Sequence, residues 1–268
     1  MRLLMSLLLF LVPVLIAVTP ASAQTRILQL AYEAEDGAPV TGFFYRDAET
    51  PDDAPVALLM HGLNGSTLQW LATDNRSYGD ELALMLLRRG YRVAALDARA
   101  HGARPEGANP IARVMAAREG NTEAYREMIT ETIGDYRQLL DLMDEEAGGP
   151  TNVLVVGYSM GAQMATWLAA EDSRVTHVVT LVPPSVANVP EVAPLTAAPR
   201  VDRPWLLITA TDDVFATAEQ NAALAEAGGE MVTWVSFESG HRLPQTYIGV
   251  VEAWLHEHDP RSNIERND

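Results

Sequence analysis

Short apolar runs alternate along the chain with longer segments in which apolar residues recur every three or four positions. The short runs are rich in β-branched residues, which indicates strands, and they are Val56–Met60, Arg92–Leu96, Asn152–Val156, His177–Val182, Trp205–Thr209 and Met231–Phe237. The longer segments have the spacing of helices, and they are Tyr78–Arg89, Thr122–Met143, Ala162–Ala170, Thr217–Ala227 and Gln245–His256. This alternation predicts an α/β fold in which crossover helices join parallel strands. Several runs are apolar at successive positions, as expected of a sheet covered by helices on both faces.

Three further segments complete the predicted architecture. Arg26–Glu33 and Pro39–Arg46 alternate in polarity on either side of Asp36-Gly37, and they predict an antiparallel hairpin at the sheet edge. The sheet then has about eight strands. Pro183–Pro204 contains six prolines and little periodicity, which predicts a loop over the strand ends and not a lid domain. Ala103–Gly120 predicts a second irregular segment near the same edge, so we expect a small cap or none.

The first residues differ in composition from the rest of the chain. Arg2 precedes a short apolar stretch that Pro13 interrupts, and Ala21-Ser22-Ala23 supplies the small residues at which signal peptidases cut. The stretch is shorter than the roughly 20 apolar residues of a spanning helix. We therefore expect a signal peptide over residues 1–23, cleavage after Ala23, one domain over residues 24–268, and a periplasmic or secreted protein without a membrane anchor after cleavage.

Composition excludes several kinds of chemistry. The chain has a formal net charge of −17, no lysine and no cysteine. Such a charge repels nucleic acids and anionic membranes, so neither is an expected partner. Schiff-base, P-loop and thiolate chemistry need residues that the chain lacks. No spacing of the H-E-x-x-H type occurs, so no metal is expected. The sequence does not indicate an oligomeric state.

One pentapeptide carries a candidate nucleophile. Residues 157–161 read Gly-Tyr-Ser-Met-Gly, directly after a predicted strand and directly before a predicted helix. In that setting Gly-x-Ser-x-Gly forms a sharp turn that lifts the serine Oγ out of the sheet. The following helix directs its N-terminus at developing negative charge. Ser159 is therefore the candidate nucleophile; the alternative is a glycine-rich turn with an incidental serine.

A serine nucleophile needs a base that is held by an acid. His241 follows the last predicted strand, and Asp212 and Asp213 follow the strand Trp205–Thr209, so each candidate lies where ligands bind in open parallel sheets. The offset of Asp213 from the strand end favours it over Asp212, which would otherwise serve a turn or a helix cap before Thr217. The other histidines lack this combination of loop and position, and they are His61, His101, His177, His256 and His258.

The tetrahedral intermediate of acyl transfer needs two N–H donors. One candidate is the backbone N–H of Met160, the residue after the nucleophile. The other is the N–H of Leu63, in the loop His61-Gly62-Leu63-Asn64-Gly65 after the strand Val56–Met60. The two glycines allow this backbone to bend towards the site. We interpret His61 itself as a residue that braces the loop.

These motifs together resemble the α/β-hydrolase family of single-domain esterases and lipases over about residues 40 to 257. They are His61-Gly62, the turn Asp97-Ala-Arg99-Ala-His101-Gly102, Gly-Tyr-Ser-Met-Gly and the pair Asp213 and His241. The turn is similar to Asp-x-Arg-Gly-His-Gly of the family, with Ala100 in place of the first glycine. The resemblance implies an α/β-hydrolase catalytic domain over residues 24–268 and hydrolysis through an acyl-enzyme, without a cofactor.

Hydrolysis of a small-molecule carboxylic ester is the function that we expect from these residues. The same three side chains serve amide, peptide and thioester hydrolases, and these alternatives stay open. A binding protein that keeps the fold without catalysis is a third alternative. The short loops predict an accessible site that suits small or water-soluble esters.

Overall fold

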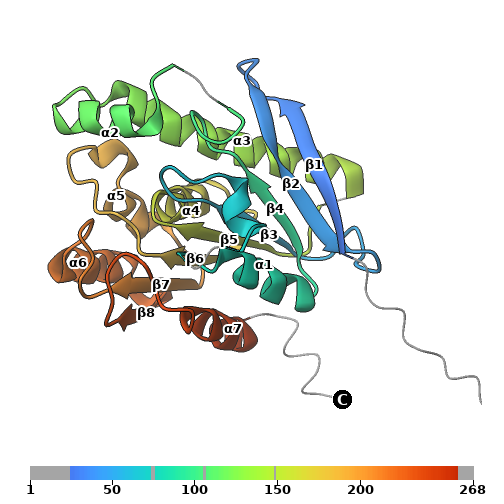
Figure 1. The fold of residues 1–268 in the computed structure, drawn as a ribbon. Helices are drawn as coiled ribbons and strands as arrows, with labels where there is room; N and C mark the ends of the chain where they lie inside the picture. Colours follow the sequence, from blue (N-terminus) through green and yellow to red (C-terminus); the bar gives the residue numbers. More distant parts are fainter. Residues whose placement is uncertain (1–24, 74–75, 105–106, 148, 259–268) are drawn as a thin grey trace, which may run out of the picture.

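The eight strands in the described part of the chain join in one sheet, with helices on both faces (Figure 1). The computed structural model describes residues 25–73, 76–104, 107–147 and 149–258, so the predicted signal peptide lies outside the described residues. The strand order is β1-β2-β4-β3-β5-β6-β7-β8. The strands are β1 (Thr25–Glu33), β2 (Pro39–Asp47), β3 (Val56–Met60), β4 (Arg92–Leu96), β5 (Val153–Tyr158), β6 (Val175–Leu181), β7 (Trp205–Ala210) and β8 (Val232–Phe237). The predicted fold class is therefore confirmed.

The strand directions also agree with the sequence. The six strands from β4 to β8 along the sheet pair in parallel, and β1 and β2 form an antiparallel hairpin at the edge. The hairpin joins the sheet through β2, which pairs antiparallel with β4. All positions of β3, β4, β5 and β7 are buried, because helices cover both faces of these central strands.

Two helical layers cover the sheet. The helices are α1 (Gly79–Arg88), α2 (Pro110–Arg118), α3 (Glu123–Ala147), α4 (Met160–Glu171), α5 (Pro194–Ala197), α6 (Ala218–Gly228) and α7 (Tyr247–His258), with short 3₁₀ turns η1 (Thr67–Trp70), η2 (Pro190–Val192), η3 (Ala198–Arg200) and η4 (Gly229–Met231). Buried side chains of α3, α4 and α6 form one core with one face of the sheet, and those of α1 and α7 form a second core with the other.

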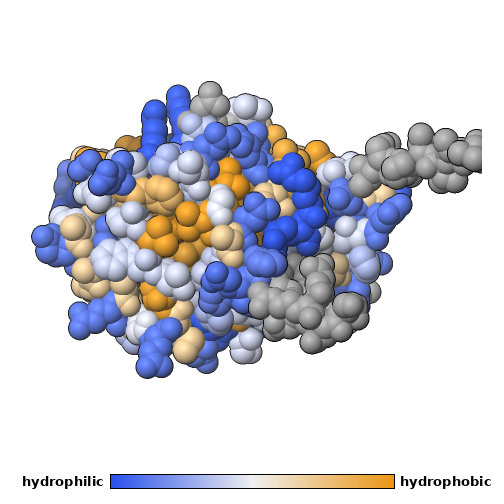
Figure 2. Space-filling view, turned by 90° about the horizontal axis from the view of Figure 1, so that it is seen from below, coloured by the Kyte–Doolittle hydropathy of each residue, from blue (hydrophilic) through white to orange (hydrophobic). Residues whose placement is uncertain are grey.

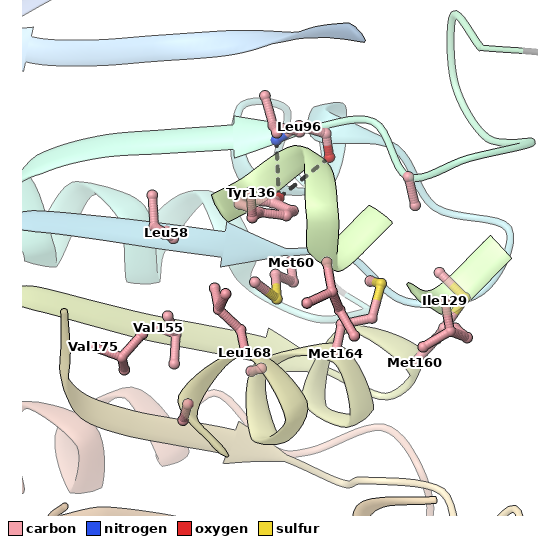
Figure 3. Close-up of a cluster of buried hydrophobic side chains, with 14 of the residues drawn as sticks. Leu58, Met60, Leu96, Ile129, Tyr136, Val155, Met160, Met164, Leu168 and Val175 are labelled. Atoms are coloured by element: carbon pink, nitrogen blue, oxygen red, sulfur yellow. Dashed lines mark hydrogen bonds between the residues drawn. The ribbon is translucent and has the colours of Figure 1, made fainter. Parts of the chain in front are cut away.

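The core beneath the carboxyl ends of β3 and β5 is fixed by one tyrosine as well as by apolar packing (Figure 3). The Tyr136 hydroxyl, on α3, donates to the Leu59 carbonyl at 2.7 Å and accepts from the Leu96 N–H at 3.0 Å. Met164 and Leu168 of α4 pack into the same cluster. Neighbouring strands and α3 are thus held in register close to the loops that follow them.

The expectation of an irregular segment over residues 103–120 was wrong, because α2 lies there. Its N-terminus is capped by the side chain of Asn109, which accepts from the Ala112 N–H at 2.9 Å. Pro110 occupies the first turn, where its missing N–H costs no hydrogen bond. This proline therefore begins a helix and does not interrupt one. The Pro183–Pro204 segment is irregular as predicted except for η2, α5 and η3.

Figure 2 shows one face, on which hydrophilic residues predominate and hydrophobic residues gather mainly near the middle. Over the part of the chain that the structure describes, none of the helices combines the length and hydropathy that a bilayer crossing requires.

Candidate active site

Ser159 lies on a sharp turn between β5 and α4. Its backbone has φ 55° and ψ −118°, outside the regions that a serine ordinarily occupies. The turn depends on two close approaches: a Cβ on Gly157 would lie 2.1 Å from the Gly161 carbonyl oxygen, and a Cβ on Gly161 would lie 1.9 Å from that of Met60. The sequence needs glycine at both positions, because any side chain would separate strand from helix. The strained conformation holds Ser159 at the start of α4.

The structure brings Ser159, His241 and Asp213 together in a chain of hydrogen-bonding contacts. His241 Nε2 lies 2.8 Å from Ser159 Oγ. Its Nδ1 lies 3.0 and 2.9 Å from the two carboxylate oxygens of Asp213. The Nδ1–H tautomer donates to Asp213 and leaves Nε2 free to accept the serine proton. This is the geometry that a serine nucleophile and its base require.

Asp213, not Asp212, is the acid that reaches the histidine. Its side chain is only 2 % exposed, and one of its carboxylate oxygens also accepts the Phe215 N–H at 2.8 Å. Asp212 is exposed, and its backbone N–H donates to the Ser239 carbonyl. The helix cap that we considered for the second aspartate is supplied by Thr217, which forms a capping box with Gln220.

Two aromatic residues that the sequence analysis missed hold His241 in place. The Tyr158 hydroxyl donates to the His241 carbonyl at 2.8 Å and accepts the Leu243 N–H at 3.2 Å. The Phe215 ring packs edge-on against the imidazole, with ring centroids 4.5 Å apart. Tyr158 occupies a variable position of the pentapeptide and Phe215 a polar loop, so neither carries a signal in the sequence alone.

Leu63 and Met160 line the same cavity as Ser159 and His241. The loop that carries Leu63 is bent by hydrogen bonds from Gly65 N–H to the Gly62 carbonyl and from Gly62 N–H to Gln69 Oε1, at 2.9 and 3.0 Å. The sequence analysis had not identified Gln69. Both residues predicted to supply the oxyanion donors thus line the cavity that contains the serine.

His61 holds this loop in place through hydrogen bonds at both of its ring nitrogens. Its Nε2 accepts the Ala98 N–H at 3.0 Å, and its Nδ1 donates to the Gly62 carbonyl at 2.9 Å. Complete burial, together with the nearby ring of His101, lowers the pKa of His61 from its usual 6.5 to about 4. The imidazole is therefore neutral at neutral pH, and its protonation would remove the acceptor for Ala98.

We expect acid to destabilise the protein before its carboxylates titrate. Between pH 6.5 and about 4 the unfolded chain binds a proton at His61 that the folded chain does not, so the free energy of unfolding falls as the pH falls. From pH 7 to 5 the loss from this group is about 2 kcal/mol, since each pH unit within the window contributes about 1.4 kcal/mol. Urea unfolding at both pH values measures it.

A comparison of variants tests this assignment. His61→Gln should flatten the pH dependence of the unfolding free energy, whereas His256→Gln, at an exposed helix position, should leave it as in the wild type. Equal slopes in wild type and His61→Gln would contradict the assignment. His101, whose pKa is also lowered by burial, contributes to the slope that remains.

The remaining histidines lie away from Ser159. His177 Nε2 and the His258 carbonyl are 3.0 Å apart, and the imidazole of His258 stacks on Trp254. His256 is exposed on α7. Within the described ranges, no three side chains of His, Asp or Glu gather in positions that could hold a metal ion.

A cavity of about 760 Å³ opens at Ser159. Its walls come from the loop after β3, from α2, from the segment after β6 and from the loop after β7. Most of the lining side chains are apolar, among them Leu63, Val114, Met160, Val186, Val189 and Phe215. Such a cavity buries an apolar group and leaves the reacting carbonyl at the serine.

The fold and this site define a class of protein, and a comparison of the sequence with known protein families gives the same class independently. Residues 57–263 match the alpha/beta hydrolase family. The chain therefore belongs to this family. No curated protein matches the sequence.

Solved structures with this fold include several esterases. A cold-adapted esterase from an Arctic intertidal metagenomic library superposes with a TM-score of 0.70 and is 22% identical, with 87% of this chain and 94% of that chain covered. An acetyl xylan esterase from Paenibacillus sp. R4 has a TM-score of 0.70 at 17% identity, covering 90% of this chain and 86% of its own. An esterase of Pyrococcus furiosus has a TM-score of 0.66 at 18% identity, covering 87% and 93%. At these levels of sequence identity, the structural similarity shows that the proteins share a fold.

Proposed function

We propose that this protein is an exported serine hydrolase of carboxylic esters, with Ser159 as nucleophile, His241 as base and Asp213 as the orienting acid. The observation that carries the proposal is the 2.8 Å contact between Ser159 Oγ and His241 Nε2 at the floor of an apolar cavity. The esterases among the structural neighbours are in accord with it. Export rests on the composition of residues 1–23 alone.

The proposed reaction begins when Ser159 Oγ attacks the ester carbonyl carbon and His241 Nε2 takes the hydroxyl proton. The oxyanion that forms is stabilised by the N–H groups of Leu63 and Met160. Asp213 keeps Nδ1 protonated and stabilises the imidazolium. The intermediate then collapses, and His241 delivers its proton to the departing alcohol, which leaves an acyl-enzyme.

A water molecule completes the cycle. His241 removes a proton from the water as its oxygen attacks the acyl carbonyl, and the second tetrahedral intermediate expels Ser159 Oγ, which regains the proton from His241. One ester and one water thus give one acid and one alcohol. The ester must fit between α2, the segment after β6 and the loop that carries Phe215.

Two measurements on the purified protein test the proposed function. We expect hydrolysis of 4-nitrophenyl butyrate and covalent labelling of Ser159 by a fluorophosphonate, in which Oγ displaces fluoride from phosphorus. We expect no comparable cleavage of the matched 4-nitroanilide. Cleavage of the anilide with a similar kcat/KM would favour an amide hydrolase. Absence of both labelling and ester hydrolysis would favour a binding protein.

A further inference from the structure

Helix α2 forms one wall of the cavity and presents two large apolar side chains to it, while its Val114 and Ala117 also pack against the core. Ile111 and Met115, four positions apart, are 43% and 47% exposed, and both line the cavity together with Val114. In an ordinary amphipathic helix such a stripe is buried against the body of the protein. Here the apolar stripe lines the cavity that contains Ser159. An apolar part of a bound substrate would therefore pack against it.

Hydrogen bonds from neighbouring segments fix this wall. The Asn188 side chain, from the segment after β6, donates to the Ala117 carbonyl in the last turn of α2 at 3.1 Å. The Ser185 N–H donates to the Phe215 carbonyl at 3.1 Å, which joins that segment to the loop of Asp213. Val186 between them has a φ of 39°, a strained value for a β-branched residue. The cavity is thus built in advance of substrate binding.

The charges around this cavity are unlike those of the chain as a whole. The chain has 36 acidic residues and 19 arginines, yet no aspartate and no glutamate is among the described residues that line this cavity. Arg118, at the end of α2, is the one arginine among these described lining residues. No ion pair or hydrogen bond joins its side chain to another residue in the part of the chain that the structure describes. Arg99 and Arg174, by contrast, each bind two or more carboxylates.

We propose that Arg118 selects esters that combine an apolar stem with a carboxylate at the end remote from the ester bond. This inference rests on the proposed function and deepens it. A guanidinium binds a carboxylate through paired hydrogen bonds, and the attraction is stronger beside an apolar wall than in open water. Because the surrounding protein is strongly acidic, an anionic substrate meets favourable charge at this cavity and repulsion elsewhere.

A purely structural role for Arg118 makes a different prediction. A cation in the last turn of a helix interacts favourably with the helix dipole and so stabilises the helix slightly. Removal of the charge would then lower the melting temperature and affect all esters alike. Selectivity between charged and neutral esters is therefore the measurement that separates the two roles.

The test uses 4-nitrophenyl half-esters of adipic, suberic and sebacic acids beside the 4-nitrophenyl esters of hexanoic, octanoic and decanoic acids. We expect the wild type to favour at least one half-ester over its neutral counterpart in kcat/KM. Arg118→Gln should lower that ratio by about fivefold, the effect of one partly exposed ion pair, and Arg118→Glu should lower it further. Added NaCl should lower the ratio in the wild type.

Arg126→Gln is the matched control, because Arg126 is exposed on α3 outside the cavity and its replacement changes the net charge equally. This variant should keep the wild-type ratio. Equal ratios in wild type, Arg118→Gln and Arg126→Gln would overturn the inference, as would a loss in Arg118→Gln that is the same for both ester series. Hydrolysis of neutral esters by the wild type in either case would leave the proposed function intact, whereas its absence would contradict that function.

Discussion

Replacing Ser159 by alanine is expected to lower kcat for 4-nitrophenyl butyrate by about 10⁴-fold or more. The variant lacks the oxygen that attacks the carbonyl, while the cavity and the N–H groups of Leu63 and Met160 stay in place and retain a small part of the acceleration. Initial rates under saturating substrate measure the effect. A fluorophosphonate should then add no mass to the protein.

The fold of this variant should be intact. Alanine can occupy the φ of 55° at position 159 at a cost similar to that of serine, and only the contact with His241 is lost. We therefore expect a melting temperature within a few degrees of the wild type by circular dichroism. Ester hydrolysis within tenfold of the wild type by a folded Ser159→Ala protein would refute the assignment of the nucleophile.

Asp213→Asn should lower kcat/KM by about 10³- to 10⁴-fold, the second largest effect that we expect. An asparagine amide that donates to His241 Nδ1 would favour the tautomer with the proton on Nε2, which cannot accept a proton from Ser159. The carboxamide oxygen can still accept the Phe215 N–H, so the loop should keep its conformation. Steady-state kinetics with a soluble ester measure the effect.

The neighbouring aspartate provides the control for this prediction. Asp212→Asn changes the net charge equally at an exposed position, and the backbone N–H that bonds to Ser239 is retained. We expect its kcat/KM to stay within about threefold of the wild type, as for most exposed substitutions. A larger loss in Asp212→Asn than in Asp213→Asn would reverse the assignment.

The sheet was predictable because its signals are local. Strands such as Val56–Met60 are apolar at every position, and the stripe from Tyr125 to Met143 has the spacing of one buried helix face, as α3 shows. The pentapeptide around Ser159 is readable as a motif, although only one of its glycines is required by a local approach: a Cβ on Gly157 would meet the Gly161 carbonyl oxygen, whereas a Cβ on Gly161 would meet that of Met60, on a distant strand. The order of strands along the chain then predicted that Asp213 and His241 follow neighbouring strands, as they do after β7 and β8.

Other features depend on contacts between distant segments, and the sequence could not supply them. Helix α2 was missed because its apolar residues Ile111 and Met115 face the cavity and Pro110 resembles a break. Gln69 and Tyr158 support the site through side-chain hydrogen bonds to backbone, which leave no periodic pattern in the sequence. The Asp97 turn was recognised as a motif, but not the function of its carboxylate, which accepts the N–H groups of Thr67 and Ala103 at 2.8 and 3.0 Å.

The attachment of α2 has a consequence for how such a protein can diversify. In Figure 1 the helix lies above α5, with α6 further down on the same side of the picture. Among the described residues, a hydrogen bond from Asn188 to the Ala117 carbonyl joins α2 to the segment after β6. Ser159, His241 and Asp213 come from other elements. Substitutions on the cavity face of α2 can therefore accumulate without displacing the reacting groups, so that substrate range and chemistry can evolve as separate traits in this chain.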